Sequence, residues 1–266
     1  MKIVVCVKQT PSTTAVFSVE NGAVSWDDPG GKPTVLNPWD EFAVEEALRV
    51  MEAHGGEALA VTMGDESSKE SLKTCLAMGC TDAVLISDEA FAGSDTLGTA
   101  RVLAAAIEKI EDVQLAVFGR QAIDGDTGQT IVQTAFKLGW TPLTFVAQIR
   151  ELDPAAGTIT VDRLTEEGRE TVTASLPVVI SVVKEINEPR YPSFMGIRKA
   201  SRATIPVWSG ADLDLDGGSG APGCKVDWSE IYELPGRDTS VEIIEADSVE
   251  EQAKILVDRL FEEKVI

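Results

Sequence analysis

Short apolar runs alternate with helical segments from residue 2 to residue 138. The runs are rich in β-branched or small apolar residues, and the segments between them carry apolar positions three or four residues apart. Repeated strand–helix units of this kind build a mostly parallel sheet with helices on both faces. The sequence therefore predicts an α/β fold with strands at 2–7, 58–62, 83–87 and 115–118, and with helices from 37 to about 54, from 64 to 79, from 95 to about 110, and from the end of a loop at 119–130 to 138.

The first of these helices has the clearest ends. Asn37 is a favourable N-cap residue, Pro38 suits the first turn, and Asp40 complements the positive end of the helix dipole. Gly55-Gly56 then ends the helix after His54.

The pattern changes after residue 140. Residues 143–150, 158–163, 170–174 and 178–183 are expected to form strands joined by tight turns, which would extend the sheet with antiparallel strands. The following segment, Asn187-Glu-Pro-Arg-Tyr-Pro-Ser-Phe194, contains two prolines and is expected to be neither strand nor helix.

The end of the chain is expected to be an arm separate from the main domain. Residues 216–223 have the glycine-rich composition of a linker, and an amphipathic helix follows from about Ser248 to Lys264. This helix either docks on a partner chain or folds back onto its own domain. We therefore divide the chain into a domain at 1–215 and a linker with a C-terminal arm at 216–266.

The charge of the chain excludes some partners. Asp and Glu number 44 against 23 Lys and Arg, a net charge of -21. An acidic surface of this kind repels nucleic acid and anionic lipid. It either steers the protein toward a basic patch on a protein partner or serves solubility alone.

Other simple classes are also disfavoured. The chain has no apolar stretch near the roughly 20 residues that span a bilayer, so membrane insertion is not expected. No signal peptide is visible, and the four cysteines form no CxxC pair beside the single His54, so we expect a reduced, cytoplasmic protein without a metal site.

The loop at 119–130 is the strongest candidate for a binding site. It joins an expected strand to an expected helix, where α/β proteins hold the phosphates of nucleotides. Asp124 and Asp126 offer acceptors for ribose hydroxyls, and Gly125 and Gly128 allow close approach of a ligand to the backbone. The loop is neither a Walker sequence nor GxGxxG, and a plain solvated turn is the alternative.

Other expected strand ends would line the same crevice. Cys6 and Lys8 follow the first strand, Asn37 begins a helix, and Thr62-Met63 ends the second strand.

A second helix start, near Asp95, places two threonines on one face. Thr96 and Thr99 are three residues apart, where their hydroxyls would hydrogen-bond a flavin ring at the positive end of the helix. The alternative is ordinary N-capping by Ser94 or Asp95. The sequence contains no catalytic triad, so binding or electron transfer fits better than hydrolysis, and whether the chain is an enzyme stays open.

Four segments together resemble one known family. The chain is similar to the electron transfer flavoprotein β subunit in Val4-Val-Cys-Val-Lys-Gln9, Asn37-Pro-Trp-Asp-Glu-Phe-Ala-Val-Glu-Glu-Ala47, Gly119-Arg-Gln-Ala-Ile-Asp124 and Asn187-Glu-Pro-Arg-Tyr-Pro-Ser193. The resemblance implies a Rossmann-like domain and a heterodimer with a larger α subunit that carries an FAD. It also implies a C-terminal arm that wraps that subunit.

The resemblance further implies a docking loop for acyl-CoA dehydrogenases. By position its exposed apolar anchor is Phe194, flanked by Met195 and preceded by Tyr191. We expect these residues to bind the partner.

The β site of the family holds either FAD or a structural AMP. Asp124-Gly-Asp-Thr127, Thr96 and Thr99 resemble the bifurcating members, which oxidise NADH and send electrons to the α-subunit FAD and to a low-potential acceptor such as ferredoxin or flavodoxin. Those members usually continue Ala-Gln-Val-Gly-Pro, whereas this chain has Gly128-Gln-Thr-Ile-Val132. FAD is the expected cofactor and AMP, in a non-bifurcating subunit, the alternative. A universal-stress-type adenine-nucleotide module is a second alternative.

The expected cofactor contacts come from the strand ends, the two helix starts and the loop. They are Cys6, Lys8, Asn37, Asp40, Thr62, Met63, Thr96, Thr99, Gly119, Arg120, Gln121, Ala122, Ile123, Asp124, Gly125, Asp126, Thr127, Gly128, Gln129 and Thr130.

Overall fold

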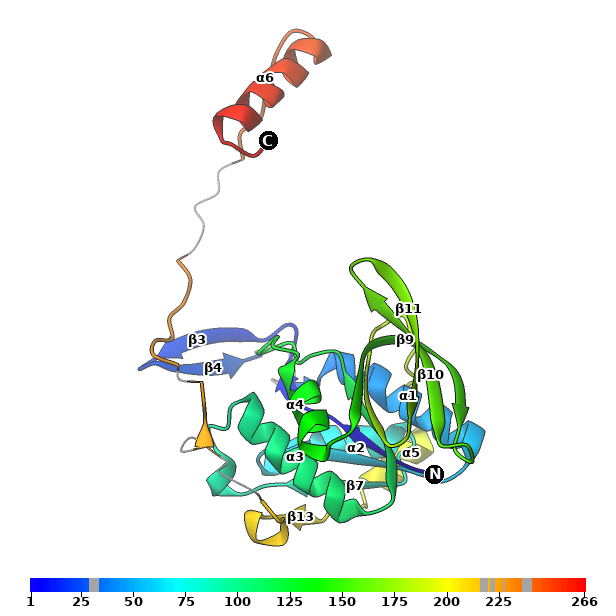
Figure 1. The fold of residues 1–266 in the computed structure, drawn as a ribbon. Helices are drawn as coiled ribbons and strands as arrows, with labels where there is room; N and C mark the ends of the chain where they lie inside the picture. The colour runs from blue at the N-terminus through cyan, green and yellow to red at the C-terminus, as the bar shows by residue number, and fades with distance from the viewer. Residues whose placement is uncertain (29–33, 216–219, 221–222, 227, 236–240) are drawn as a thin grey trace. The chain divides into compact units, whose positions relative to one another are not determined.

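A computed structural model describes residues 1–28, 34–215, 220, 223–226, 228–235 and 241–266. Within these residues nine strands form one sheet in the order β11-β10-β9-β12-β8-β1-β6-β7-β13 (Figure 1). The strands are β1 (Lys2–Cys6), β6 (Glu57–Met63), β7 (Asp82–Ile86), β8 (Val113–Gly119), β9 (Thr141–Asp153), β10 (Thr158–Thr165), β11 (Gly168–Ser175), β12 (Val178–Val182) and β13 (Val207–Trp208).

The sheet is parallel from β9 through to β13 and antiparallel only where β10 and β11 extend it. The α/β fold and the mostly parallel sheet predicted from the sequence are therefore confirmed, and so is an antiparallel extension, formed by β10 and β11. The expectation of antiparallel pairing is wrong for 143–150 and 178–183, because β12 pairs in parallel with both β8 and β9. Strand order reverses between β1 and β8, because the chain builds outward from β1 through β6 and β7 and then returns to β8.

Helices cover both faces of the sheet. On one face, α1 (Pro38–His54) and α2 (Lys69–Met78) pack their apolar sides on alternate residues of β1 such as Ile3 and Val5. On the other face, α3 (Thr96–Ile110) and α4 (Gln129–Leu138) pack on Val4 and Cys6. Successive residues of a strand point to opposite faces, so one short strand serves two cores.

Several elements were not predicted from the sequence. A hairpin of β3 (Val16–Glu20) and β4 (Ala23–Asp27) and a small sheet of β2 (Gln9–Pro11) and β5 (Thr34–Leu36) lie between β1 and α1 in the chain. One-turn 3-10 helices stand at Glu66–Ser68, Glu89–Phe91 and Gly210–Asp212.

The expectation that residues 187–194 hold no helix is wrong at its last residue. Phe194 begins the short helix α5 (Phe194–Ala200), which packs against α2. Pro192 stands before the helix, and the Oγ of Ser193 caps it by accepting a hydrogen bond from the N–H of Gly196 at 2.9 Å. The prolines therefore exclude a helix or strand only up to Ser193, the N-cap residue of α5.

The chain divides into two compact units, Met1–Glu230 and Ile231–Ile266. The second unit contains the predicted amphipathic helix, α6 (Val249–Glu262), in which no residue is buried. Most of the predicted linker at 216–223 lies outside the described residues. The boundary at 215, the docking of α6 on a partner and its folding back onto the first unit all stay predictions.

We predict that truncating the buried Leu72 to alanine lowers the free energy of unfolding by about 2–5 kcal/mol. The side chain of Leu72 is completely buried between α2 and the sheet. The same substitution at Leu234, which is 81% exposed, should change it by less than about 0.5 kcal/mol. Urea unfolding measures both, and equal effects would contradict the described core.

Candidate functional site

The candidate site lies where the strand order reverses, at the carboxyl ends of β1 and β8. In doubly wound α/β sheets, this point leaves a crevice between the loops that diverge to opposite faces. Here the loops are Val7-Lys8 after β1 and residues 119–130 after β8, with the start of α1 beside them. The fold thus brings the loops predicted from the sequence to one place.

Asn37 joins α1 to the 119–130 loop. Its Nδ2 donates to the carbonyl oxygen of Gln121 at 2.8 Å, and its Oδ1 accepts from the N–H of Ile123 at 3.2 Å. The side chain makes no cap hydrogen bond to α1, so the predicted N-capping role is wrong. The reason is competition, because the loop carries unpaired backbone groups that the same amide satisfies.

Asp40 holds the other loop from a buried position. Its Oδ2 accepts from the backbone N–H of Lys8 at 2.7 Å. Burial raises the pKa of Asp40 to about 7, although hydrogen bonds from the Lys8 N–H, the Asn37 side chain and the Gly119 N–H oppose the rise. One carboxylate thus bonds the chain after β1 and the chain at the end of β8.

Gly119 is fixed by the same contact. A Cβ there would overlap Oδ1 of Asp40 and lie 2.6 Å from the carbonyl carbon of Trp39. Only glycine lets the end of β8 pass this close to the first turn of α1.

The two expected ribose acceptors already have partners within the chain. Both oxygens of Asp124 accept from Nζ of Lys8, at 2.8 and 2.6 Å, and Oδ1 of Asp126 accepts from Nε2 of Gln121. An ionised carboxylate has about four lone-pair sites, so each keeps capacity for a ligand hydroxyl. Their contact with a ribose stays a prediction.

The end of the loop forms the start of α4. Gly128 adopts a left-handed conformation with φ of 60°. The N–H of Gln129 donates to Oγ1 of Thr127 at 3.5 Å, and the N–H groups that follow stand at the positive end of the helix dipole. Such an end favours an anionic ligand.

Arg120 occupies a position that sequence reasoning did not foresee. Its guanidinium carbon lies 5.4 Å from the ring centroids of both Trp39 on α1 and Phe145 on β9. Phe145 has a φ of 58°, which is uncommon for a bulky residue, and β9 shifts register beside it. Trp39 and Phe145 were missed because a lone aromatic in a helix or strand carries no sequence signal for a cation–π contact.

The second expected helix start is capped by Asp95. Its Oδ1 accepts from the N–H of Gly98 at 2.8 Å, and its Oδ2 accepts from the N–H groups of Lys225 and Val226 at 2.7 and 3.2 Å. Ordinary capping by Asp95 is therefore present. Thr96 and Thr99 are half-buried on the first turn of α3, and their contact with a flavin stays a prediction.

The remaining residues expected to contact the cofactor lie at the same carboxyl edge of the sheet and differ in how far they are buried. Cys6 is buried and burial raises the pKa of its thiol, Thr62 is completely buried, and Met63 is half-buried. Within the described part of the chain, Oγ1 of Thr62 has no hydrogen-bond partner.

The expected partner-binding residues are strongly exposed. Tyr191 is 95%, Phe194 80% and Met195 69% exposed. Apolar side chains in this state are typical of contact surfaces. Asn187 and Arg190, just before them, bond carboxylates of α1, which sequence reasoning did not identify.

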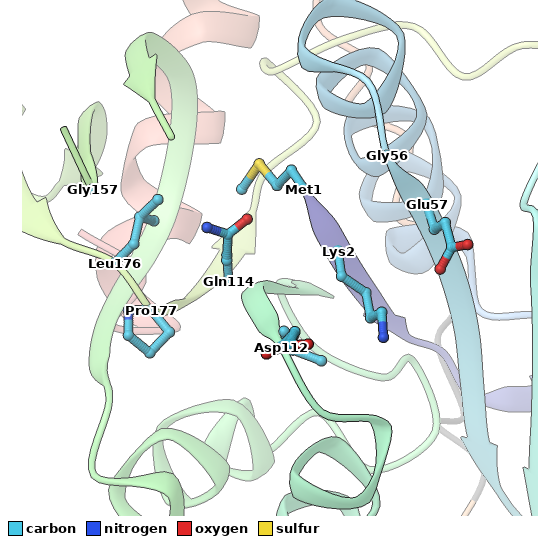
Figure 2. A pocket seen from close by; sticks show the side chains of 10 residues that line it. Met1, Lys2, Gly56, Glu57, Asp112, Gln114, Gly157, Leu176 and Pro177 are labelled. Carbon is cyan, nitrogen blue, oxygen red and sulfur yellow. The ribbon is translucent and has the colours of Figure 1, made fainter. Parts of the chain in front are cut away.

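A hollow of about 650 Å³ lies at the opposite edge of the sheet. Met1, Lys2 and Gln114, at the amino ends of β1 and β8, line it together with Leu176 and Pro177 (Figure 2). None of the predicted site residues lines it. Ligands of doubly wound folds bind at the carboxyl edge, so this hollow is not the candidate site.

The described residues contain neither a metal-binding cluster nor a membrane-crossing helix. No group of three or more His, Cys, Asp or Glu residues there is placed to hold a metal ion. No helix in the same residues has both the length and the apolar character for crossing a membrane.

Comparison with known proteins gives one family. The model for the electron transfer flavoprotein domain matches residues 28–213. The chain is 38% identical over 270 residues to the caffeyl-CoA reductase-Etf complex subunit CarD of Acetobacterium woodii, with all of both chains covered. It is 38% identical over 272 residues to the electron transfer flavoprotein subunit beta of Clostridium acetobutylicum, again with both covered completely. To protein FixA of Azotobacter vinelandii it is 38% identical over 253 residues, covering 92% of this chain and 89% of the relative.

We predict that Asp40 makes stability depend on pH. A carboxyl whose pKa is higher in the folded than in the unfolded chain stabilises the fold below about pH 4, and this contribution is lost as pH rises toward 7. As pH rises from about 4 to about 7, the unfolding free energy of the wild type should therefore fall by roughly 4 kcal/mol relative to that of Asp40→Asn. Urea unfolding at several pH values measures this change. Parallel pH profiles for the two proteins would refute the claim that burial raises the pKa of Asp40.

We also predict that Gly119→Ala destabilises the nucleotide-free chain by about 1–3 kcal/mol, because the new methyl group meets backbone and a buried carboxylate. The matched control is Gly125→Ala in the same loop, where a Cβ meets nothing within 4 Å. Thermal unfolding compares the two, and a Gly119→Ala protein as stable as the control would contradict the close approach.

Proposed function

The chain belongs to the electron transfer flavoprotein β-subunit family, and from this premise we propose that it pairs with a larger α subunit whose FAD shuttles electrons. The matches to subunits named as parts of such complexes extend over the whole chain, which supports a subunit rather than a stand-alone adenine-nucleotide sensor. The C-terminal arm with α6 is proposed to dock on the α subunit, since its apolar residues Val249, Leu256 and Val257 are exposed.

The cofactor of this subunit is proposed to be FAD, held at the carboxyl edge of β1 and β8. The single observation that carries the site is the convergence of Lys8, Asn37 and Asp40 on the 119–130 loop. The positive end of the α4 dipole suits an anionic phosphate group, and Gly125 has space beside its Cα for close approach. A nucleotide of either kind, FAD or AMP, fits these groups.

Different residues of the chain have different proposed roles in binding the nucleotide. Lys8, which pairs with Asp124 in the same loop, would contribute a positive charge toward a phosphate, while Asn37 and Asp40 hold the two loops at a fixed separation. Thr96 and Thr99 offer hydroxyls at the positive end of α3, which favours a reduced, anionic ring. A bound flavin supplies reversible uptake of electrons, so the chain itself needs no nucleophile.

The proposed path of the electrons begins at NADH and leads to the α-subunit FAD and then to an acyl-CoA dehydrogenase. A second branch, to a low-potential acceptor such as ferredoxin or flavodoxin, is proposed on the resemblance of Asp124–Thr127, Thr96 and Thr99 to bifurcating members. The relative whose name places it in a caffeyl-CoA reductase complex supports a partner that acts on a CoA ester. The cytoplasm is the proposed location.

The alternative is a non-bifurcating subunit in which AMP only stabilises the fold. The sequence Gly128-Gln-Thr-Ile-Val132, which departs from the bifurcating pattern, favours this alternative. Under it, Thr96 and Thr99 have no ligand role and Asp95 simply caps α3.

We predict two FAD molecules per heterodimer when the complex with the α subunit is purified, denatured and its released nucleotides are identified. One FAD and one AMP would overturn the FAD proposal in favour of the structural alternative. The Gly119→Ala heterodimer serves as the control. It should lose the nucleotide of this subunit and keep the FAD of the α subunit, which assigns the lost nucleotide to the site described above.

A further inference from the structure

The segment before α5 is tied to α1 at two points. At the first point, Nδ2 of Asn187 donates to the carbonyl oxygen of Phe42 and to Oε2 of Glu46, both at 3.0 Å. Asn187 is 9% exposed, so these are contacts inside the protein. They hold the chain where it leaves the sheet after β12.

The second point is Arg190, which binds two carboxylates of α1 at once. Its Nε and Nη2 donate to Oε2 and Oε1 of Glu45 at 2.7 and 3.1 Å, and its Nη1 and Nη2 donate to Glu52 at 2.6 and 3.1 Å. The backbone N–H of Arg190 also donates to Glu45 at 3.2 Å. Glu45 and Glu52 are seven residues apart, two helical turns on the same face of α1.

The ion pair with Glu45 is well shielded from water. The Glu45 side chain is 4% exposed and that of Arg190 34%. Burial acts to raise the pKa of Glu45, but hydrogen bonds from Arg190 and Arg49 outweigh it and the pKa is lowered. Removing Arg190 would leave a buried carboxylate with one fewer cation, so the contact is stronger than an ordinary surface pair.

The downstream end of the segment is fixed on α2. A Cβ at Gly196 would overlap the carbonyl oxygen of Ala77, so α5 lies directly on the end of α2. The exposed Tyr191, Phe194 and Met195 stand between this contact and Arg190. The surface formed by these three side chains is therefore held from both ends, by α1 and by α2.

We infer that Arg190 is a positioning residue for the surface formed by Tyr191, Phe194 and Met195, acting through Glu45 and Glu52 of α1. The inference rests on the proposed function in taking an acyl-CoA dehydrogenase as the partner, and on the expectation from the sequence that this surface is where it docks. Exposed side chains on a short segment lose binding energy if the segment samples many orientations, because binding must then order it. Two carboxylates on one planar guanidinium leave the segment a single orientation.

The geometry also specifies why the residue is an arginine. A lysine at 190 retains the charge but presents one ammonium group, which cannot place two donors on each of two carboxylates seven residues apart. The conservative substitution Arg190→Lys therefore tests the orientation of the segment separately from its charge.

The experiment uses the heterodimer with its α subunit and compares three variants. Arg190→Lys breaks the double contact, Phe194→Ala removes the proposed anchor itself, and Arg49→Lys is the matched control. Arg49 donates to the same Glu45 at 3.0 Å, but from within α1. Hydrogen exchange of residues 187–197, nucleotide content, and steady-state electron transfer from NADH through the heterodimer to a purified acyl-CoA dehydrogenase with its enoyl-CoA substrate are measured for each.

Arg190→Lys should speed amide exchange at residues 187–197 and raise the KM for the heterodimer about tenfold with kcat and nucleotide content unchanged. Arg49→Lys should leave both exchange and KM as in the wild type. Unchanged exchange, or faster exchange with an unchanged KM, overturns the positioning role. A lower kcat or lost nucleotide in Arg190→Lys overturns it as well, because the effect would then be general.

The Phe194→Ala variant separates this inference from the proposed function. If Phe194→Ala leaves KM unchanged, the surface is not the docking site and the partner-binding role predicted for Phe194 is wrong, whatever Arg190→Lys does to exchange. If Phe194→Ala raises KM and Arg190→Lys does not, the docking site stands and the positioning role of Arg190 fails.

Discussion

The carboxylate of Asp40 is the contact on which the candidate site depends. It is buried beneath the crevice, where it accepts the N–H of Lys8 and lies against the backbone of Gly119. A buried acceptor with two backbone donors is costly to leave unpaired, so the loops after β1 and β8 are held together even without a ligand. Loops held in this way would lower the ordering cost of binding a ligand there.

Helix α1 extends this constraint to the surface beside α5. Its first turn carries Asn37 and Asp40 toward the nucleotide loops, and its later turns carry Glu45, Glu46 and Glu52 toward the segment at 187–190. A helix of this length is stiff, so both regions take their positions from one element. Two sequence segments that carry the family resemblance, one starting at Asn37 and one at Asn187, therefore meet in a single network.

The elements with strong periodicity were predictable and those fixed by a tertiary partner were not. Apart from the two-residue β13, which was not predicted, the parallel strands and the four helices around them follow from apolar patterns that local chain geometry imposes. The β3–β4 hairpin was missed because most of its apolar residues, such as Phe17 and Trp26, are partly exposed, so the alternation marks no core face. Helix α5 was missed because Pro192 and Ser193 mark a helix start as well as a loop.

By itself the sequence determined the class of fold, the place of the loop between β8 and α4 and the family, because these depend on periodicity and on short runs of neighbouring residues. Tertiary structure alone decided what individual side chains do. Asn37 binds Gln121 and Ile123 rather than capping α1, Lys8 pairs with Asp124, and Arg120 stacks between two rings. Each of these partners is far away in the chain or on another element, and a hydrogen-bonding group takes the partner that folding places within about 3 Å.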